Sequence, residues 1–497
     1  MIASKKRLIA NDLIPLSIIE TATQDSSEAT GLKSEYEEIE HFYHVYKNGI
    51  KPYDLVFDEV KANEAYKQAT MLINRESRFM FSRTPDFNVV PRGNVDDLQE
   101  SDRAKINVLQ DFVNEVLKRN KIGKKLTKAI KDCLIGRRIA WVVNFNEQSG
   151  ISIFFLKALN FYVEYDADGE SITKFAYYVY TKKSQTVSNQ RIFLKEYYYS
   201  DDGYCTIKER VYDGAGSLIE DMGETKTDLN FIPCGVIIND GLIGEVEGRS
   251  DIEELEELEK SYNRQASKDI DAENGAMNPV KYLIDIDPFS TEKLTSGAGA
   301  TWDLSSDVSK ENAKTAVGVL APPMTHVSAV EKTLERTKSA MHELVDVPDT
   351  SMDKMTGTIT SGKGMTAVYW NLSVRCDEKM QTWIPELENI INVIIEGAFQ
   401  YSKIASKYTL NILQSVNYTV NVIANYAIQS DEFEEKTSDM AEVNLNIMSR
   451  REYNKKWRKM TDRQTDEEIK RIVEESTMID SAASFGNQVI ETNEDVI

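Results

Sequence analysis

The stretch from His342 to Met380, HELVDVPDTSMDKMTGTITSGKGMTAVYWNLSVRCDEKM, joins the end of one helical pattern to the start of another. Residues 347–361 between them are small, polar and glycine-bearing, which predicts a loop. Ser361 is a favourable N-cap residue, so the second helix is expected to begin near Gly362. This order of helix, polar loop and long helix decides how the rest of the chain is interpreted.

The helix after the loop is predicted to be very long, reaching about residue 403. Pro385 lies inside it, and an interior proline removes a helical hydrogen bond and clashes with the preceding turn. We therefore expect a kink there. The apolar positions of this helix recur at helical spacing; they are Met365, Val368, Leu372, Cys376, Met380, Trp383, Leu387, Ile390, Ile391, Ile394, Ile395 and Ala398.

Gly357, Gly362 and Lys363 also stand at the spacing of a phosphate-binding P-loop. A P-loop needs a buried strand before the glycine-rich turn and a hydroxyl residue after the lysine, whereas this chain has DTSMDKMT before it and Gly364 after it. The match is therefore interpreted as a surface loop. The helix start, with Lys363, carries a weak positive potential that suits a passing anion; a surface turn with no ligand is the alternative.

Upstream of this stretch, the spacing of apolar residues changes several times along the chain. Residues 1–34 are predicted to be a loose arm. Helical spacing dominates from Glu35 to about Ile135. From Arg138 to about Ile238, aromatic and β-branched residues alternate between Gly/Asp turns, which predicts an antiparallel meander. Helices followed by antiparallel strands indicate an α+β fold.

A third region begins near residue 241. A helix over residues 246–272 should carry one apolar stripe and an opposite face of Glu253, Glu254, Glu256, Glu257 and Glu259. That face is either a solvent-exposed surface or a surface that faces another molecule without binding to it. Short strands follow within residues 273–325, then a second helix over residues 326–346. NYTVNVIANYAI, near residues 417–428, should be one more strand.

The C-terminal segment, residues 431–497, is predicted to contain helices followed by a frayed tail. Two capping boxes, Ser449 with Glu452 and Thr465 with Glu468, should each open a helix.

Composition narrows the possible functions. The 497 residues carry a net charge of −22, whereas a free-standing nucleic-acid binder normally has a basic surplus. The four separated cysteines are typical of buried thiols in a reducing compartment. We find no signal peptide, no stretch long enough for a membrane helix, and no motif for catalysis or a cofactor. His41 and His44 lack further ligands for a metal. The protein is expected to be soluble and made in a cytoplasm.

Three segments together resemble the portal, or head-to-tail connector, proteins of tailed bacteriophages, of the type common in long-tailed phages. One is Asn278–Pro279 after the acidic helix, followed by short strands. The second is the stretch from His342 to Met380. The third is SRREYNKKWRKMTDRQTDEEIKRIVEE, which ends at Glu475. The resemblance covers most of residues 35–476, and it rests on the order of the segments.

The resemblance implies a mainly helical α+β portal fold that forms a ring of identical subunits, usually twelve. It assigns a part to each segment. These are a wing over residues 35–240, stem helices at 241–272 and 326–346, a small α/β clip at 273–325, a tunnel loop at 347–361, a spine helix with its return strand at 362–430, and a crown and tail at 431–497.

The resemblance also implies a function. Portals are not enzymes; they form the DNA channel at one capsid vertex, through which double-stranded DNA is packaged and later ejected. The implied partners are double-stranded DNA, the terminase large subunit, the head-tail adaptor, the major capsid protein and scaffolding protein, in a virion. The candidate DNA-facing residues are, in the loop, Lys354, Met355, Thr356, Gly357, Thr358 and Lys363, and, in the stem, Glu253, Glu254, Glu256 and Glu257.

Two other functions stay open. One is a different ring-forming connector or adaptor of the virion, although adaptors are small and lack such a long helix. The other is a degenerate P-loop NTPase, in which Lys363 would be needed for nucleotide binding.

Overall fold

The computed structural model divides the chain into two compact units. The first comprises residues 1–349 and 371–427, and the second comprises residues 350–370 and 428–497. The residues that the structure describes are 14–53, 62–92, 100–146, 150–167, 169, 171–180, 191–241, 247–277, 280–287, 302, 304–307, 309, 314, 316–320, 327–350, 362–401, 404, 410, 416–426, 432–458, 465 and 467–475.

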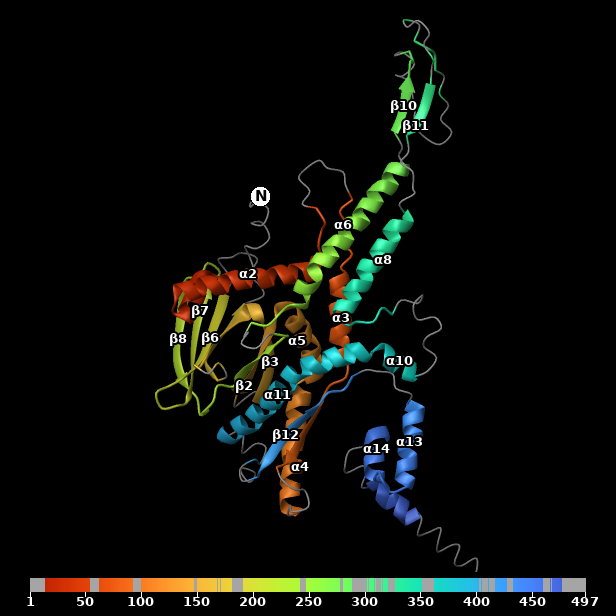
Figure 1. Ribbon diagram of the computed structural model, residues 1–497. Helices are drawn as coiled ribbons and strands as arrows, with labels where there is room; N and C mark the ends of the chain where they lie inside the picture. Colours follow the sequence, from red (N-terminus) through yellow and green to blue (C-terminus); the bar gives the residue numbers. More distant parts are fainter. Residues whose placement is uncertain are drawn as a thin grey trace, which may run out of the picture. The chain divides into compact units, whose positions relative to one another are not determined.

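Helices α1 to α5 and strand β1 come first in the first unit (Figure 1). The prediction of a loose arm over residues 1–34 is wrong from residue 14 onward. Ile18 and Ile19 of α1 are fully buried, and the Asp25 side chain caps α2 by accepting hydrogen bonds from the Ser27 and Glu28 amides. The bounds are α1 Leu16–Thr23, α2 Ser26–Asn48, α3 Gln68–Phe81, β1 Asp86–Pro91, α4 Glu100–Asn120 and α5 Ile122–Gly136.

The antiparallel strands form two main sheets instead of the single predicted meander. Strands β4 to β8 are a five-stranded meander, whereas β2 pairs with β3 on one side and β9 on the other. The reason is that the first six residues of β2 are all buried, so this strand is central and needs a partner on both edges. The bounds are β2 Arg138–Asn146, β3 Gly150–Lys157, β4 Phe161–Tyr165, β5 Ile172–Tyr180, β6 Arg191–Tyr199, β7 Cys205–Asp213, β8 Leu218–Lys226 and β9 Cys234–Ile238.

Two long helices, α6 (Asp251–Met277) and α8 (Val327–Leu344), pack side by side and carry a small hairpin at their far end (Figure 1). The hairpin consists of β10 (Val280–Ile284) paired antiparallel with β11 (Ala316–Leu320). The two predicted helices are confirmed, although α6 begins at residue 251 and ends five residues beyond the predicted residue 272.

Helix α11 (Trp370–Gln400) supplies much of the core of the first unit. Trp383 is 1% exposed, and its ring centroid lies 4.9 Å from that of Phe81 on α3. The helix continues through Pro385, so the kink stays a prediction. The predicted return strand is confirmed as β12 (Tyr418–Ile423), which pairs antiparallel with β1.

The second unit contains α10 (Gly362–Val368), α13 (Glu432–Asn444) and α14 (Arg450–Arg458). Helix α10 begins at the predicted residue, but a turn at Tyr369 ends it, so the single helix predicted over residues 362–403 is wrong.

The predictions for the C-terminal caps have opposite outcomes. The first capping box is confirmed, because the Ser449 hydroxyl accepts a hydrogen bond from the Glu452 amide at 3.1 Å. The second is wrong: Thr465 is itself helical, and among the described residues its buried hydroxyl has no hydrogen-bond partner. Glu468 instead forms an ion pair with Arg458 at 3.2 Å.

Candidate functional site

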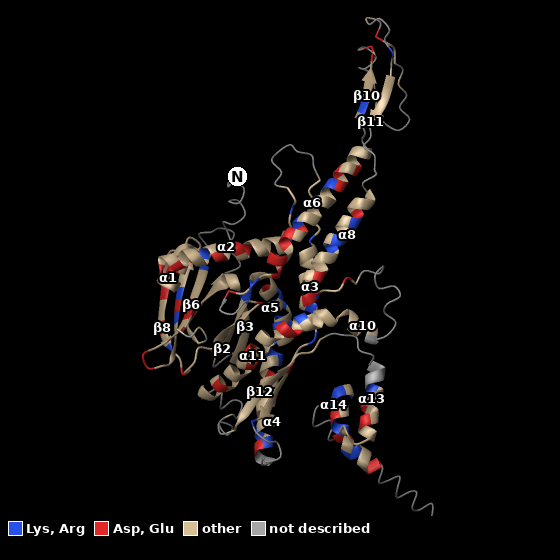
Figure 2. Cartoon of the chain, in the orientation of Figure 1, with Lys and Arg blue, Asp and Glu red and all other residues tan. Residues whose placement is uncertain are grey.

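The acidic run of α6 from Asp251 to Glu259 lies at the end of the helix that joins the body of the first unit (Figure 2). Three of the four predicted wall residues contact basic side chains of the same chain, and Glu257 is exposed. The distances are 3.4 Å for Glu253 to Arg137, 3.8 Å for Glu254 to Arg375 and 2.9 Å for Glu256 to His41. Two of the four carboxylates, Glu253 and Glu254, thus lie near an arginine, and a channel-facing role for the four residues stays a prediction.

Glu259 was expected on the same solvated face, and that expectation is wrong. The residue is 1% exposed, and its carboxylate accepts a hydrogen bond from the Ala69 amide at 2.8 Å. Ala69 lies in the first turn of α3, where backbone N–H groups have no partner within the helix. Glu259 therefore caps α3 from α6 and joins the two helices.

A buried ionic cluster connects α6 to α3 and α11. It consists of Glu76 on α3, Asp251 on α6, and Arg375 and Lys379 on α11. Lys379 Nζ lies 2.7 Å from Glu76 Oε1 and 2.8 Å from Asp251 Oδ2. Arg375 lies 3.3 Å from each of the same two carboxylates. Three different helices are thus joined by two cations and two anions.

The electrostatics of the cluster favour the ionised forms of the lysine and the aspartate. Burial alone favours a neutral Asp251, but Lys379 and Arg375 outweigh it and hold the pKa of that carboxyl below its ordinary value. Asn239 adds a hydrogen bond to Asp251 at 2.9 Å. Burial likewise opposes the charge on Lys379, yet Asp251 and Glu76 raise its pKa. For Glu76, burial is the larger effect and raises the pKa.

The sequence-based reasoning missed this cluster, although one signal was present. Lys379 lies between Cys376 and Trp383 at spacings of three and four, so it falls on the apolar face of α11. A cation on an apolar helix face requires a buried anion as its partner. The sequence could therefore have identified Lys379, but not the distant residues Glu76 and Asp251.

The start of the predicted loop is fixed to the first unit. Val345 and Val347 are 1% and 2% exposed, and Lys338 Nζ on α8 forms an ion pair with Asp349 at 3.2 Å. Of the loop candidates, residues 354–358 lie outside the described residues, which also leaves the interpretation of the P-loop match as a prediction. Lys363 lies in α10. The five residues from Val345 to Asp349, which we call the loop base, are therefore the part of this segment that is held by contacts.

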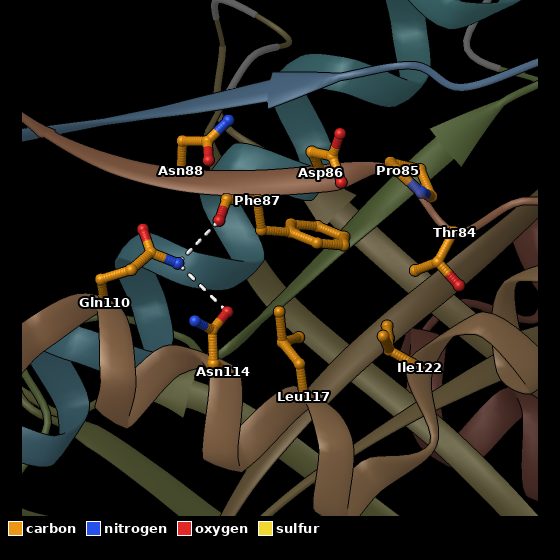
Figure 3. A pocket seen from close by; sticks show the side chains of 9 residues that line it. All are labelled: Thr84, Pro85, Asp86, Phe87, Asn88, Gln110, Asn114, Leu117 and Ile122. Carbon is orange, nitrogen blue, oxygen red and sulfur yellow. Dashed lines mark hydrogen bonds between the residues drawn. The ribbon is translucent and has the colours of Figure 1, made fainter. Parts of the chain in front are cut away.

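A pocket of about 430 Å³ lies between β1 and α4, away from these residues (Figure 3). Phe87 points into it toward Leu117 and Ile122. At one side of the pocket, the Gln110 side-chain amide donates hydrogen bonds to the Phe87 carbonyl at 2.9 Å and to Asn114 Oδ1 at 3.1 Å. Because Gln110 also accepts from the Val89 amide, its polar groups serve to join β1 to α4.

Two further predictions from the sequence concern the cysteines and membrane-spanning helices. All four cysteines are free and buried, as expected, and burial raises the pKa of Cys133. Among the described residues, no helix has the length and apolar character needed to cross a membrane.

Comparison with known families decides the identity. Residues 26–482 match the family described as "Phage portal protein, SPP1 Gp6-like". The chain belongs to this phage portal protein family. The match spans nearly the whole sequence, including both units, the cluster and the loop base. A search of curated proteins finds no match.

Membership establishes the general role of this portal protein. It is a structural component of the phage virion, located at the capsid and associated with it as an oligomer. The family is in general structural and not enzymatic. The resemblance drawn from the sequence is thereby confirmed at the level of the family.

Proposed function

We propose that the protein forms the ring-shaped channel at one capsid vertex, through which double-stranded DNA is packaged by a terminase and later ejected. The observation that carries the proposal is the family match over residues 26–482. Under this proposal α6 and α8 are the stem, β10 and β11 belong to the clip, residues 347–361 are the tunnel loop, and α11 is the spine. The ring is expected to contain about twelve subunits, by analogy with the family.

The charge of the chain supports the proposal. A channel must let a polyanion slide in both directions, so a net charge of −22 reduces adhesion of DNA phosphates to its wall. The few contacts are assigned to the loop, with Lys354, Met355 and Thr356 near DNA and Lys363 at its end. The clip is proposed to bind the terminase and then the head-tail adaptor. The major capsid protein and scaffolding protein are the proposed partners during assembly.

Mass and symmetry of the purified protein test the ring. Native mass spectrometry, with top views by negative-stain electron microscopy, is expected to show a closed ring of 56.5 kDa subunits around a central hole. A compact dimer, stable over a wide concentration range, would contradict the proposal. Nucleotide binding that is lost in Lys363→Ala would instead support the NTPase interpretation.

Deletion of residues 352–358 tests the role of the loop. Because the deleted residues lie beyond the fixed loop base, the variant is expected to form rings of normal mass but to package less DNA. The measurement is the DNA content of phage particles made with the variant. As a control, Asp201→Ala in the exposed turn between β6 and β7 should leave DNA content unchanged. Normal DNA content after the 352–358 deletion would show that this segment does not act on DNA.

A further inference from the structure

His342 occupies a buried position at the end of α8, just before the segment that leads into the loop. The residue is 5% exposed, and its Nδ1 lies 2.7 Å from the Val347 carbonyl oxygen. The carbonyl can only accept, so Nδ1 carries the proton and donates. The other ring nitrogen, Nε2, is buried and has no hydrogen-bond partner among the residues that the structure describes. The neutral imidazole therefore makes one directed contact, to the backbone of the loop base.

Other contacts also hold the loop base, Val345 to Asp349, in place. The Val345 and Val347 side chains are buried. Arg75 on α3 reaches the Pro348 carbonyl at 3.5 Å, and Lys338 pairs with Asp349. The loop base is therefore attached both to α8 and to α3, the helix that supplies Glu76 to the ionic cluster.

We propose that His342 is a positioning residue that fixes the loop base against α8 and α3 and so sets the point at which the channel loop leaves the helix pair. The proposal deepens the proposed function and rests on it for the role of the loop in DNA passage. The attachment itself involves only described residues. Without the Nδ1–H donor, the buried Val347 carbonyl would lose its partner, and the loop base would separate more readily from α8.

Protonation of His342 should weaken the attachment. An imidazolium at this position would place a second, unsatisfied N–H donor and a positive charge in a buried site. Burial is the largest effect and lowers the pKa of His342. The hydrogen bond to the Val347 carbonyl and the carboxylate of Asp349 favour the charged form, whereas Arg75 on α3 and Lys338 on α8 disfavour it, and the pKa lies below its ordinary value. Because the folded state binds the proton less readily than the unfolded state, stability is lost as the pH falls below the ordinary histidine value.

The test compares two substitutions by hydrogen exchange of the assembled protein at pH 8 and pH 5.5, corrected for intrinsic rates. His342→Asn keeps a side-chain N–H donor but does not titrate, whereas His342→Leu has no donor. We expect the amides of Val345, Asp346, Val347 and Asp349 to exchange about tenfold faster in His342→Leu at both pH values. The wild type should lose protection at pH 5.5, whereas His342→Asn should be protected equally at both. His41→Asn, which replaces a half-exposed histidine, is the matched control and should behave as wild type.

The outcomes separate this proposal from the proposed function. Equal exchange in wild type and His342→Leu at pH 8 would overturn the positioning role, whatever the effect on DNA. Loss of protection at pH 5.5 in His342→Asn as well would overturn the role of protonation. If exchange follows the expectation but His342→Leu leaves the DNA content of particles unchanged, the positioning role stands, and its proposed consequence for DNA passage fails.

Discussion

Replacing Lys379 with methionine is expected to lower the free energy of unfolding of the portal protein by about 3–5 kcal/mol. Methionine is similar in length but has no charge, so Glu76 and Asp251 would remain buried with only Arg375 as a cation. The cost of burying these two carboxylates would then no longer be offset by their closest contacts to Lys379, at 2.7 and 2.8 Å. The shift in the urea or thermal unfolding transition of the assembled protein measures the effect.

Two further variants make the result specific to the cluster. Lys226→Met removes an exposed lysine that pairs with an exposed Asp202, and it should leave the transition unchanged. The double variant Glu76→Gln with Lys379→Met removes one anion together with the cation, so it should recover part of the lost stability. A Lys379→Met protein as stable as wild type would show that the cluster does not hold the three helices together.

The second large effect is expected for Trp383→Ala, which should cost about 3–5 kcal/mol of unfolding free energy. Trp383 is among the largest fully buried side chains, and its removal leaves a cavity between α11 and Phe81 on α3. The cost combines lost apolar burial with a cavity that the packed neighbours fill only in part. The midpoint of thermal unfolding is the measurement.

The same helix supplies a matched control. Trp370 at the start of α11 is 63% exposed, so Trp370→Ala should change stability by less than about 0.5 kcal/mol. If the two variants shifted the midpoint equally, burial in the core would not be the reason for the effect of Trp383. A loss for Trp370→Ala alone would place an interface at that residue instead.

Periodicity identified most of the elements that are defined locally. The apolar stripes of α6, α8 and α11 recur every three or four residues, and the alternating residues of β4 to β8 are separated by Gly/Asp turns. These patterns depend only on helix and strand geometry, so they can be read along the chain. The succession of three segments, which includes the helix, polar loop and long helix, indicated the portal family, and the comparison confirms the family.

Other local patterns were misleading because tertiary contacts outweighed them. Residues 14–34 are polar enough to suggest an arm, yet Ile18 and Ile19 are buried and Asp25 caps α2. The strands after Arg138 looked like one meander, but β9 pairs with β2 across the chain. Pairing between distant strands leaves no local signal in one sequence.

By itself, then, the sequence determined most of the helices and strands, the fold class and the resemblance to portals, because each follows from local spacing or from the order of segments. Only the tertiary structure decided which charges are compensated. It buried Glu259 on the predicted acidic face and joined Lys379 to Glu76 and Asp251. The physical reason is that burial and long-range ion pairing depend on residues more than a hundred positions apart, whose approach is set by packing of the whole unit.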